Sequence, residues 1–153
     1  MKSTINVTTQ AELDKALAGG LFPTCTGRGD FLVGGNAKIA ACGSVRVIAT
    51  DHSHVDAYDN SQVVVRGHSL LNAYDNVQVV SCEYAAVAAY GSSEIKAFGC
   101  SDIRAYDASM VSCAEFCNVR AFDESSVTAV DNCIVSIFDK SRCLSYDYVT
   151  VSG

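Results

Sequence analysis

Acidic residues recur in this chain at multiples of sixteen positions, in two series. The first series is Asp59, Asp75, Asp107, Asp123 and Asp139, and the second is Asp51, Glu83, Glu115, Asp131 and Asp147. Together they hold ten of the seventeen acidic residues of a 153-residue chain with a formal charge of −6. If sixteen residues form one coil, each series becomes a row of carboxylates that could engage the basic groove of a protein partner. The alternative is turn chemistry, because Asp tolerates the backbone angles of tight turns and is well solvated there.

Residues suited to catalysis or metal binding are few. His52 and His68 lie sixteen residues apart, but metal ligation needs three convergent ligands, so we expect two solvent-exposed turn histidines and no metal. The sequence has no nucleophile elbow, no phosphate loop and no zinc-type cysteine pairing. We therefore predict a non-enzymatic protein without catalytic residues or a cofactor. Its acidic charge disfavours direct nucleic-acid binding, which requires a basic surface.

The acidic series belong to an eight-residue repeat that runs from Gly29 to the C-terminus. Residues 53–60 and 101–108 are its cleanest copies. If Gly29 is position one, position three is apolar in every copy, positions one and five are small, and positions two and four carry most of the polar residues. This alternation is typical of a strand with one buried and one wet face. Position seven is Gly, Asp or Glu, which predicts a corner after each strand.

Position six shows how many octads form a coil. In every second octad except the one with Cys42 this residue is aromatic, as in Tyr58 and Tyr74, whereas the intervening octads are mixed. Two octads per coil keep these series apart, and the aromatic series then stacks along one edge. The sequence therefore predicts an all-β fold, a thin parallel β-solenoid (β-helix) of two-octad, sixteen-residue coils. We call the corners with Tyr58 and Tyr74 the tyrosine edge, and those with His52 and His68 the histidine edge.

Residues 1–28 are predicted to cap the solenoid, which occupies residues 29–153 of a single structural domain. Within this segment, residues 8–20 read as a short amphipathic α-helix with Thr8 or Thr9 as N-cap and two glycines at its end. A solenoid needs such a cap, because an open first coil exposes unpaired backbone and core.

The N-terminus lacks the apolar core of a secretory signal and no apolar stretch could span a bilayer, so we expect a cytoplasmic protein with no membrane partner.

The eight cysteines fall mostly at repeat positions that hold Ser, Ala or Val in other copies. We therefore interpret them as small buried residues in a reducing compartment. Cys117 and Cys133 share position one sixteen residues apart, so they are expected to lie on neighbouring coils.

The octads resemble those of bacterial ice-nucleation proteins, as residues 57–64 (Ala-Tyr-Asp-Asn-Ser-Gln-Val-Val) illustrate. The resemblance covers about four-fifths of the chain and implies paired octads, sixteen-residue coils and a tyrosine ladder. The outward Thr-x-Thr array of that family is absent here, where positions two and four hold residues such as Lys38, Arg46 and Asp56. The resemblance thus supports the architecture and not ice binding.

Two apolar features are further candidate contacts. The first, the apolar stripe, lies at outward position four of one sheet and consists of Leu32, Ile48, Val64 and Val80. It is either covered by the N-terminal segment or free to contact a protein. The second is the last coil, where an open strand edge invites pairing in a two-fold homodimer. Its residues are Leu144, Tyr146, Tyr148, Val149 and Val151.

From these observations we expect a protein-binding solenoid that recognises a macromolecular partner through its surface. Its small size and acidity favour an inhibitor from a phage or mobile element, of the anti-CRISPR or anti-restriction type, that blocks a nucleic-acid-binding site. Two alternatives stay open: a structural, self-assembling rod related to ice-nucleation repeats, and a β-helix that binds or cleaves carbohydrate on a sheet face.

Overall fold

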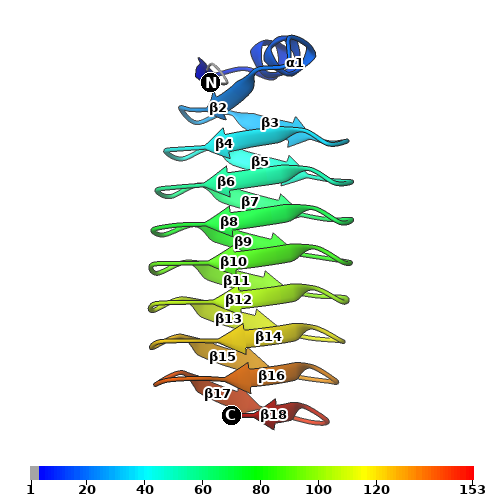
Figure 1. The fold of residues 1–153 in the computed structure, drawn as a ribbon, viewed down its shortest axis with the longest axis vertical. Coiled ribbons are helices and arrows are strands. Elements are labelled where there is room, and N and C mark those ends of the chain that lie inside the picture. Colours follow the sequence, from blue (N-terminus) through cyan, green and yellow to red (C-terminus); the bar gives the residue numbers. More distant parts are fainter. Residues whose placement is uncertain (1–3) are drawn as a thin grey trace.

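A computed structural model describes residues 4–153 as a β-solenoid with one short helix near its N-terminus (Figure 1). The ten-stranded sheet contains β1 (Thr4–Val7), β2 (Phe22–Cys25), β4 (Lys38–Ala41), β6 (His54–Ala57), β8 (Leu70–Ala73), β10 (Ala86–Ala89), β12 (Asp102–Ala105), β14 (Asn118–Ala121), β16 (Ile134–Ile137) and β18 (Thr150–Ser152). The eight-stranded sheet contains β3 (Asp30–Val33), β5 (Arg46–Ala49), β7 (Gln62–Val65), β9 (Gln78–Ser81), β11 (Glu94–Ala97), β13 (Met110–Cys113), β15 (Ser126–Ala129) and β17 (Arg142–Ser145).

From β2 onward, successive strands alternate between the two sheets, and each strand pairs in parallel with the strand one coil away. Ile39 pairs with Val55 and Val47 with Val63, so the register advances by sixteen residues without slippage. About nine coils result, and each has the sixteen residues that the octad pattern predicted. In Figure 1 the ten-stranded sheet lies in front with its strands running from right to left while the coils descend. The solenoid is therefore right-handed, like most parallel crossover connections.

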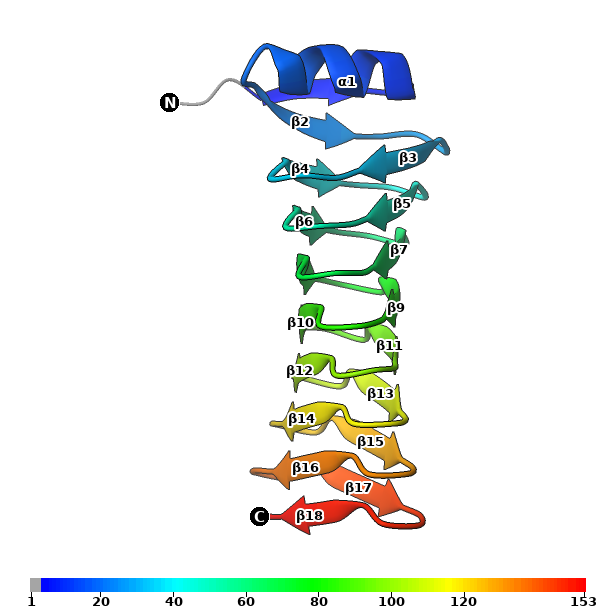
Figure 2. The ribbon, with the colours of Figure 1, turned by 90° about the vertical axis from the view of Figure 1, so that its right-hand side faces the viewer.

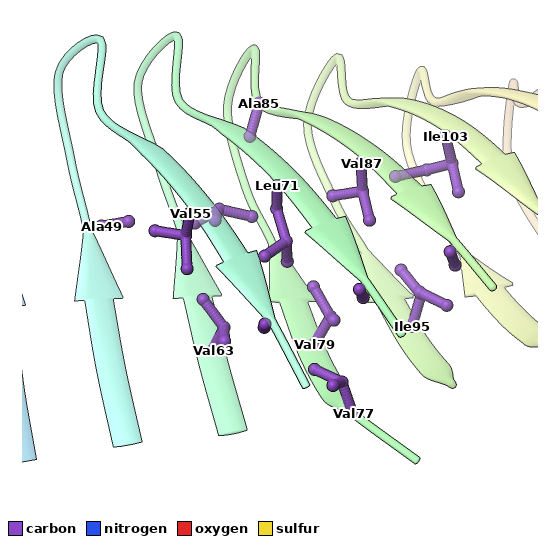
Figure 3. Packing of buried hydrophobic residues seen from close by; sticks show 14 of the residues in the cluster. Ala49, Val55, Val63, Leu71, Val77, Val79, Ala85, Val87, Ile95 and Ile103 are labelled. Atoms are coloured by element: carbon purple, nitrogen blue, oxygen red, sulfur yellow. The ribbon is translucent and has the colours of Figure 1, made fainter. Parts of the chain in front are cut away.

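The core is a thin layer between the two sheets, formed by positions one, three and five of each octad. Val45, Val47 and Ala49 illustrate the pattern, because all three are buried while Arg46 and Ile48 between them are exposed. Figure 3 shows Val55, Leu71 and Val87 on one sheet facing Val63 and Val79 on the other. Small residues at positions one and five let the sheets approach closely, and β-branched residues at position three fill the centre.

Helix α1 (Gln10–Ala18) covers the N-terminal end of the core, as the sequence predicted (Figure 2). Thr9 is the N-cap: its hydroxyl accepts from the Glu12 N–H, and the Glu12 carboxylate accepts from the Thr9 N–H. This reciprocal capping box satisfies donors that would otherwise be free at the helix start. Leu13 and Ala16 are buried against the first coil, so the apolar face of the helix closes the end of the solenoid.

The sheet also begins earlier than the composition indicates, because β1 and β2 lie within residues 1–28. Pro23 and Cys25 of β2 are buried at the positions that Ile39 and Ala41 occupy one coil later. Because Pro23 lacks an N–H, it cannot donate to a neighbouring strand, and β2 pairs with β4 through Thr24 and Cys25. The octad geometry therefore continues through a segment whose residue types hide it.

Candidate functional site

The two acidic series form the rows that their spacing predicts, and all ten residues adopt a left-handed backbone conformation. Their φ angles lie between 55° and 71°, a region that L-residues other than Asn and Asp seldom enter. All ten are exposed at the corners, with the Asp59 series on the tyrosine edge and the Asp51 series on the histidine edge. In Figure 1 these edges are at the left and the right of the solenoid, respectively.

Each acidic side chain except Asp147 also bonds to the backbone of the preceding coil. The carboxylate accepts from the N–H of the position-seven residue sixteen positions earlier, as in Gly91 N–H to Asp107 Oδ2 at 2.9 Å and Gly67 N–H to Glu83 Oε2 at 2.7 Å. The other seven donor–acceptor pairs are Gly35–Asp51, Gly43–Asp59, Asp59–Asp75, Gly99–Glu115, Asp107–Asp123, Glu115–Asp131 and Asp123–Asp139. The rows are thus fixed to the backbone from one coil to the next, a feature that the sequence reasoning missed.

The tyrosine edge carries the predicted aromatic ladder. Six rings, from Tyr58 to Phe138, stack with centroids 4.8–5.1 Å apart and interplanar angles of 5–10°. Burial in the stack raises the pKa of the Tyr58 and Tyr74 phenols above the usual value, and the nearby Asp56 carboxylate raises both further. The ladder therefore holds neutral phenols beside the row of carboxylates.

The histidine edge has a second, shorter ladder at position eight of the octad. His52 stacks on His68 at 5.4 Å, as their spacing predicted, and His68 stacks on Tyr84 at 5.3 Å. The same position in the following coils holds Cys100, Phe116, Asn132 and Tyr148, all of them exposed. Aromatic rings therefore continue along this edge, but not in every coil.

The apolar stripe lies on the outer face of the eight-stranded sheet. Leu32 and Ile48 are 59% and 46% exposed, whereas Val64 and Val80 are half-buried. The stripe lines a groove of about 720 Å³ that Gln62 and Gln78 border and that ends at Lys96. Only Gln10 of the N-terminal segment lines this groove, so the segment does not cover the stripe.

The side chain of Gln10 closes the outer edge of β3 in place of a neighbouring strand. Its Nε2 donates to the Leu32 carbonyl at 3.0 Å, and its Oε1 accepts from the Leu32 N–H at 2.8 Å. This amide therefore satisfies backbone groups that would be free at the first strand of the eight-stranded sheet.

The outer face of the ten-stranded sheet carries a smaller hollow of about 250 Å³. One side of the hollow is lined by His54 and Asn72, and the other side by Asp102 and Arg104. Ala86 and Ala88 also line it, on the strand between them. Asn72 Nδ2 donates to Asp56 Oδ1 at 2.8 Å, which ties the polar groups on the first side together. Asp102 Oδ1 is buried without a hydrogen-bond partner among the residues that the structure describes.

At the C-terminal end, β17 and β18 each pair with one neighbouring strand in this 153-residue chain. The predicted contact residues Leu144, Tyr146, Tyr148 and Val151 are exposed there, with Tyr148 at 84%. Val149 differs from them, because it is partly buried against the core.

All eight cysteines are free thiols, and several occupy inward positions. Cys117 and Cys133 are buried at position one on neighbouring coils, as predicted. Most of their sister residues are serines whose hydroxyls donate to a corner carbonyl, such as Ser109 Oγ to Tyr106 O at 2.7 Å. Cys117 Sγ makes the same contact to Ala114 O at 3.2 Å. Burial raises the pKa of Cys117 to about 12, so this thiol stays protonated and is a poor nucleophile.

Residues 4–153 contain no group of three or more His, Cys, Asp or Glu side chains placed to hold a metal ion. In the same range no helix has the length and apolar character needed to cross a membrane. Comparisons of the chain with protein-family models, curated proteins and solved structures found no match. The rows of carboxylates, the interrupted ladder and the apolar groove are therefore the features from which a function can be argued.

Proposed function

We propose that the protein is a non-enzymatic binding protein whose carboxylate rows engage the basic, nucleic-acid-binding surface of a protein partner. The observation that carries this proposal is the fixing of nine carboxylates by backbone N–H groups while their residues stay exposed. A charge held in place in the free protein loses little conformational entropy on binding, so a preorganised row favours association.

The density of charge along the rod supports the same proposal. The ten acids from Asp51 to Asp147 span six coils, or roughly 29 Å at about 4.8 Å per strand. Each row therefore carries about one charge per 6 Å, roughly half the charge density of one DNA strand, whose phosphates are about 3.4 Å apart. Basic grooves that recognise a nucleic-acid backbone are complementary to such a surface. Complexes of host defence systems, including CRISPR and restriction complexes, are partners of this class.

The apolar groove on the eight-stranded sheet supplies a second contact for the same partner. Leu32 and Ile48 remain exposed beside the charged residues Arg46 and Lys96. An apolar strip rimmed by polar groups is typical of protein interfaces and would add binding free energy that salt does not screen.

A displacement experiment tests the proposal. The chain is titrated into nucleic-acid-binding complexes that hold a fluorescent DNA duplex, between about 50 mM and 200 mM salt. We expect release of the duplex by at least one complex, with an apparent affinity that falls as salt rises. The comparison variant carries Asp59, Asp75, Asp107, Asp123 and Asp139 replaced by Asn, which tolerates the same backbone and still accepts the N–H bond. It should fold, yet bind more weakly and with a smaller dependence on salt. If no complex associates with the chain at low salt, the proposal fails.

The homodimer through the last coil remains a separate proposal about this 153-residue chain. The two unpaired strand edges and the exposed Leu144 and Tyr148 support it. Light scattering after size exclusion distinguishes a discrete dimer, which would be a closed assembly, from a monomer or a filament.

A further inference from the structure

The ladder on the histidine edge is interrupted at Cys100 and again at Asn132, and Cys100 has the smaller side chain of the two. His52, His68 and Tyr84 stack in successive coils, and the next coil presents Cys100 at the same position. The coil after that presents Phe116, so the small Cys100 side chain lies between two aromatic residues. The rings are well exposed, with Tyr84 at 62% and Phe116 at 65%, and Cys100 is exposed as well.

The interruption leaves room for one planar group. Each coil advances by about 4.8 Å, so Tyr84 and Phe116 stand about 9.6 Å apart along the rod. A planar group halfway between them would lie about 4.8 Å from each, which is close to the 5.3 Å that separates the centroids of His68 and Tyr84. Tyr84 stacks on His68 with an interplanar angle of 14°, so its opposite face is directed along the rod towards the Cys100 position.

The charge beside the interruption is negative. Gly99 immediately precedes Cys100, and its N–H donates to Glu115 Oε2 at 2.6 Å. This bond places a carboxylate next to the open position. The backbone N–H groups of Cys100 and Phe116 are already bonded to Glu83 O at 2.7 Å and Gly99 O at 3.0 Å, so they are not free to bind an anion. Two aromatic residues with an adjacent carboxylate form an environment for a flat cation.

We propose that the gap between Tyr84 and Phe116 binds the guanidinium group of an arginine from the protein partner. The inference rests on the proposed function, because it assigns one specific contact of the basic partner to the histidine edge. Arginine fits better than lysine, since its planar charge stacks between aromatic faces and can donate to the Glu115 carboxylate at the same time. A neutral ring would stack in the gap but would leave the negative charge of Glu115 without a cation beside it.

Two short peptides, hexa-arginine and hexa-lysine, test the inference by isothermal titration calorimetry on the whole chain. Both carry the same charge, and bonds from guanidinium groups to the acidic rows favour arginine in every variant, so the contribution of the gap is the part of the preference that filling the gap removes. We expect the arginine peptide to bind about fivefold more tightly, since cation–π contacts at exposed sites contribute about 0.5–1 kcal/mol each and 1.4 kcal/mol is tenfold in affinity.

Substitutions at the open position provide the matched controls. Cys100→Phe supplies the missing ring and should lower the preference for arginine about fivefold, whereas Cys100→Ser keeps the gap and should retain the preference. Phe already occupies this position at residue 116, so the filled variant is expected to fold, and its thermal melt confirms this. Tyr84→Ala is the second variant: it removes one face of the gap and should reduce the preference about two- to threefold.

The outcomes separate this inference from the function on which it rests. Equal affinity for both peptides, or an arginine preference that is the same in Cys100→Phe as in the unaltered chain, overturns the guanidinium site and leaves the acidic rows as the binding surface. A failure of both peptides to bind at low salt contradicts the proposed function as well.

Discussion

Replacing Asp107 tests whether the acidic rows stabilise the fold. Asp107 has a φ of 55°, its Oδ2 accepts from the Gly91 N–H at 2.9 Å, and it lies in the middle of the row. Alanine removes the hydrogen bond and is strained by the left-handed backbone at this position. Glycine removes the bond without that strain. Asparagine keeps an acceptor oxygen and tolerates the backbone angle. The three variants therefore separate the contribution of the carboxylate from that of the turn.

The expected costs follow from these contacts. A net hydrogen bond to a charged acceptor contributes about 1.5–3 kcal/mol, and exposure at the corner brings this one down to about 1 kcal/mol. The left-handed conformation costs a residue with an ordinary side chain about 1–2 kcal/mol. We therefore expect the free energy of unfolding to fall by about 2 kcal/mol in Asp107→Ala, about 1 kcal/mol in Asp107→Gly and less than about 1 kcal/mol in Asp107→Asn.

Urea unfolding followed by far-ultraviolet circular dichroism measures these differences at constant denaturant slope. Glu124→Ala is the matched control, because Glu124 is an acid on the same edge whose side chain makes only an exposed ion pair with Lys140 at 3.7 Å. That substitution should change stability by less than about 0.5 kcal/mol. If alanine, glycine and asparagine at position 107 all match this control, the carboxylate–amide bonds do not stabilise the solenoid, and the reasoning is refuted.

Two further predictions concern the N-terminal end and the tyrosine ladder. Gln10→Ala frees the outer edge of β3, so we expect a loss of about 1–2 kcal/mol in chemical denaturation and more self-association in light scattering; an unchanged monomer of wild-type stability would contradict this role. The raised pKa values of Tyr58 and Tyr74 mean that their contribution to stability is present below the unfolded pKa near 10 and is lost as pH rises through the folded pKa. Ultraviolet titration of phenolate should show these tyrosines ionising above the free value, and replacing both by Phe should reduce the alkaline loss of stability; ionisation of both at the free value would refute the prediction.

Much of the fold could be predicted because each coil repeats the same constraints. Position three must fill the space between two sheets, and position seven must enter a left-handed turn, so residue types there reveal the register. Position six gave the coil length, because only a sixteen-residue coil keeps Tyr58, Tyr74 and Tyr90 in one stack. These constraints are local and periodic, and a single sequence displays them.

The features that escaped prediction depend on contacts between particular side chains and a neighbouring coil. Pro23 conceals β2 because proline is uncommon inside strands, although it fills the usual buried position here. Gln10 pairs with Leu32 across twenty-two residues, and nothing in the octad pattern marks that contact. The bonds from carboxylates to amides did leave a signal, namely an acid sixteen residues after a Gly or another acid. Nothing in the residue types, however, distinguishes a hydrogen-bonded acid from one that only suits the turn.

The two edges of the solenoid differ in a way that the backbone does not require. Both edges use the same corner geometry and the same advance per coil, and on the tyrosine edge rings follow one another without a break from Tyr58 to Phe138. On the histidine edge, His52, His68 and Tyr84 also stack in successive coils, so a ring can be accommodated in each coil there. Each stacked pair contributes about 0.5–1.5 kcal/mol beyond its buried area. The histidine edge forgoes two such pairs at Cys100, between the exposed rings of Tyr84 and Phe116. Packing does not explain the missing ring, and this is why we propose the interruption as the place where a partner's arginine binds.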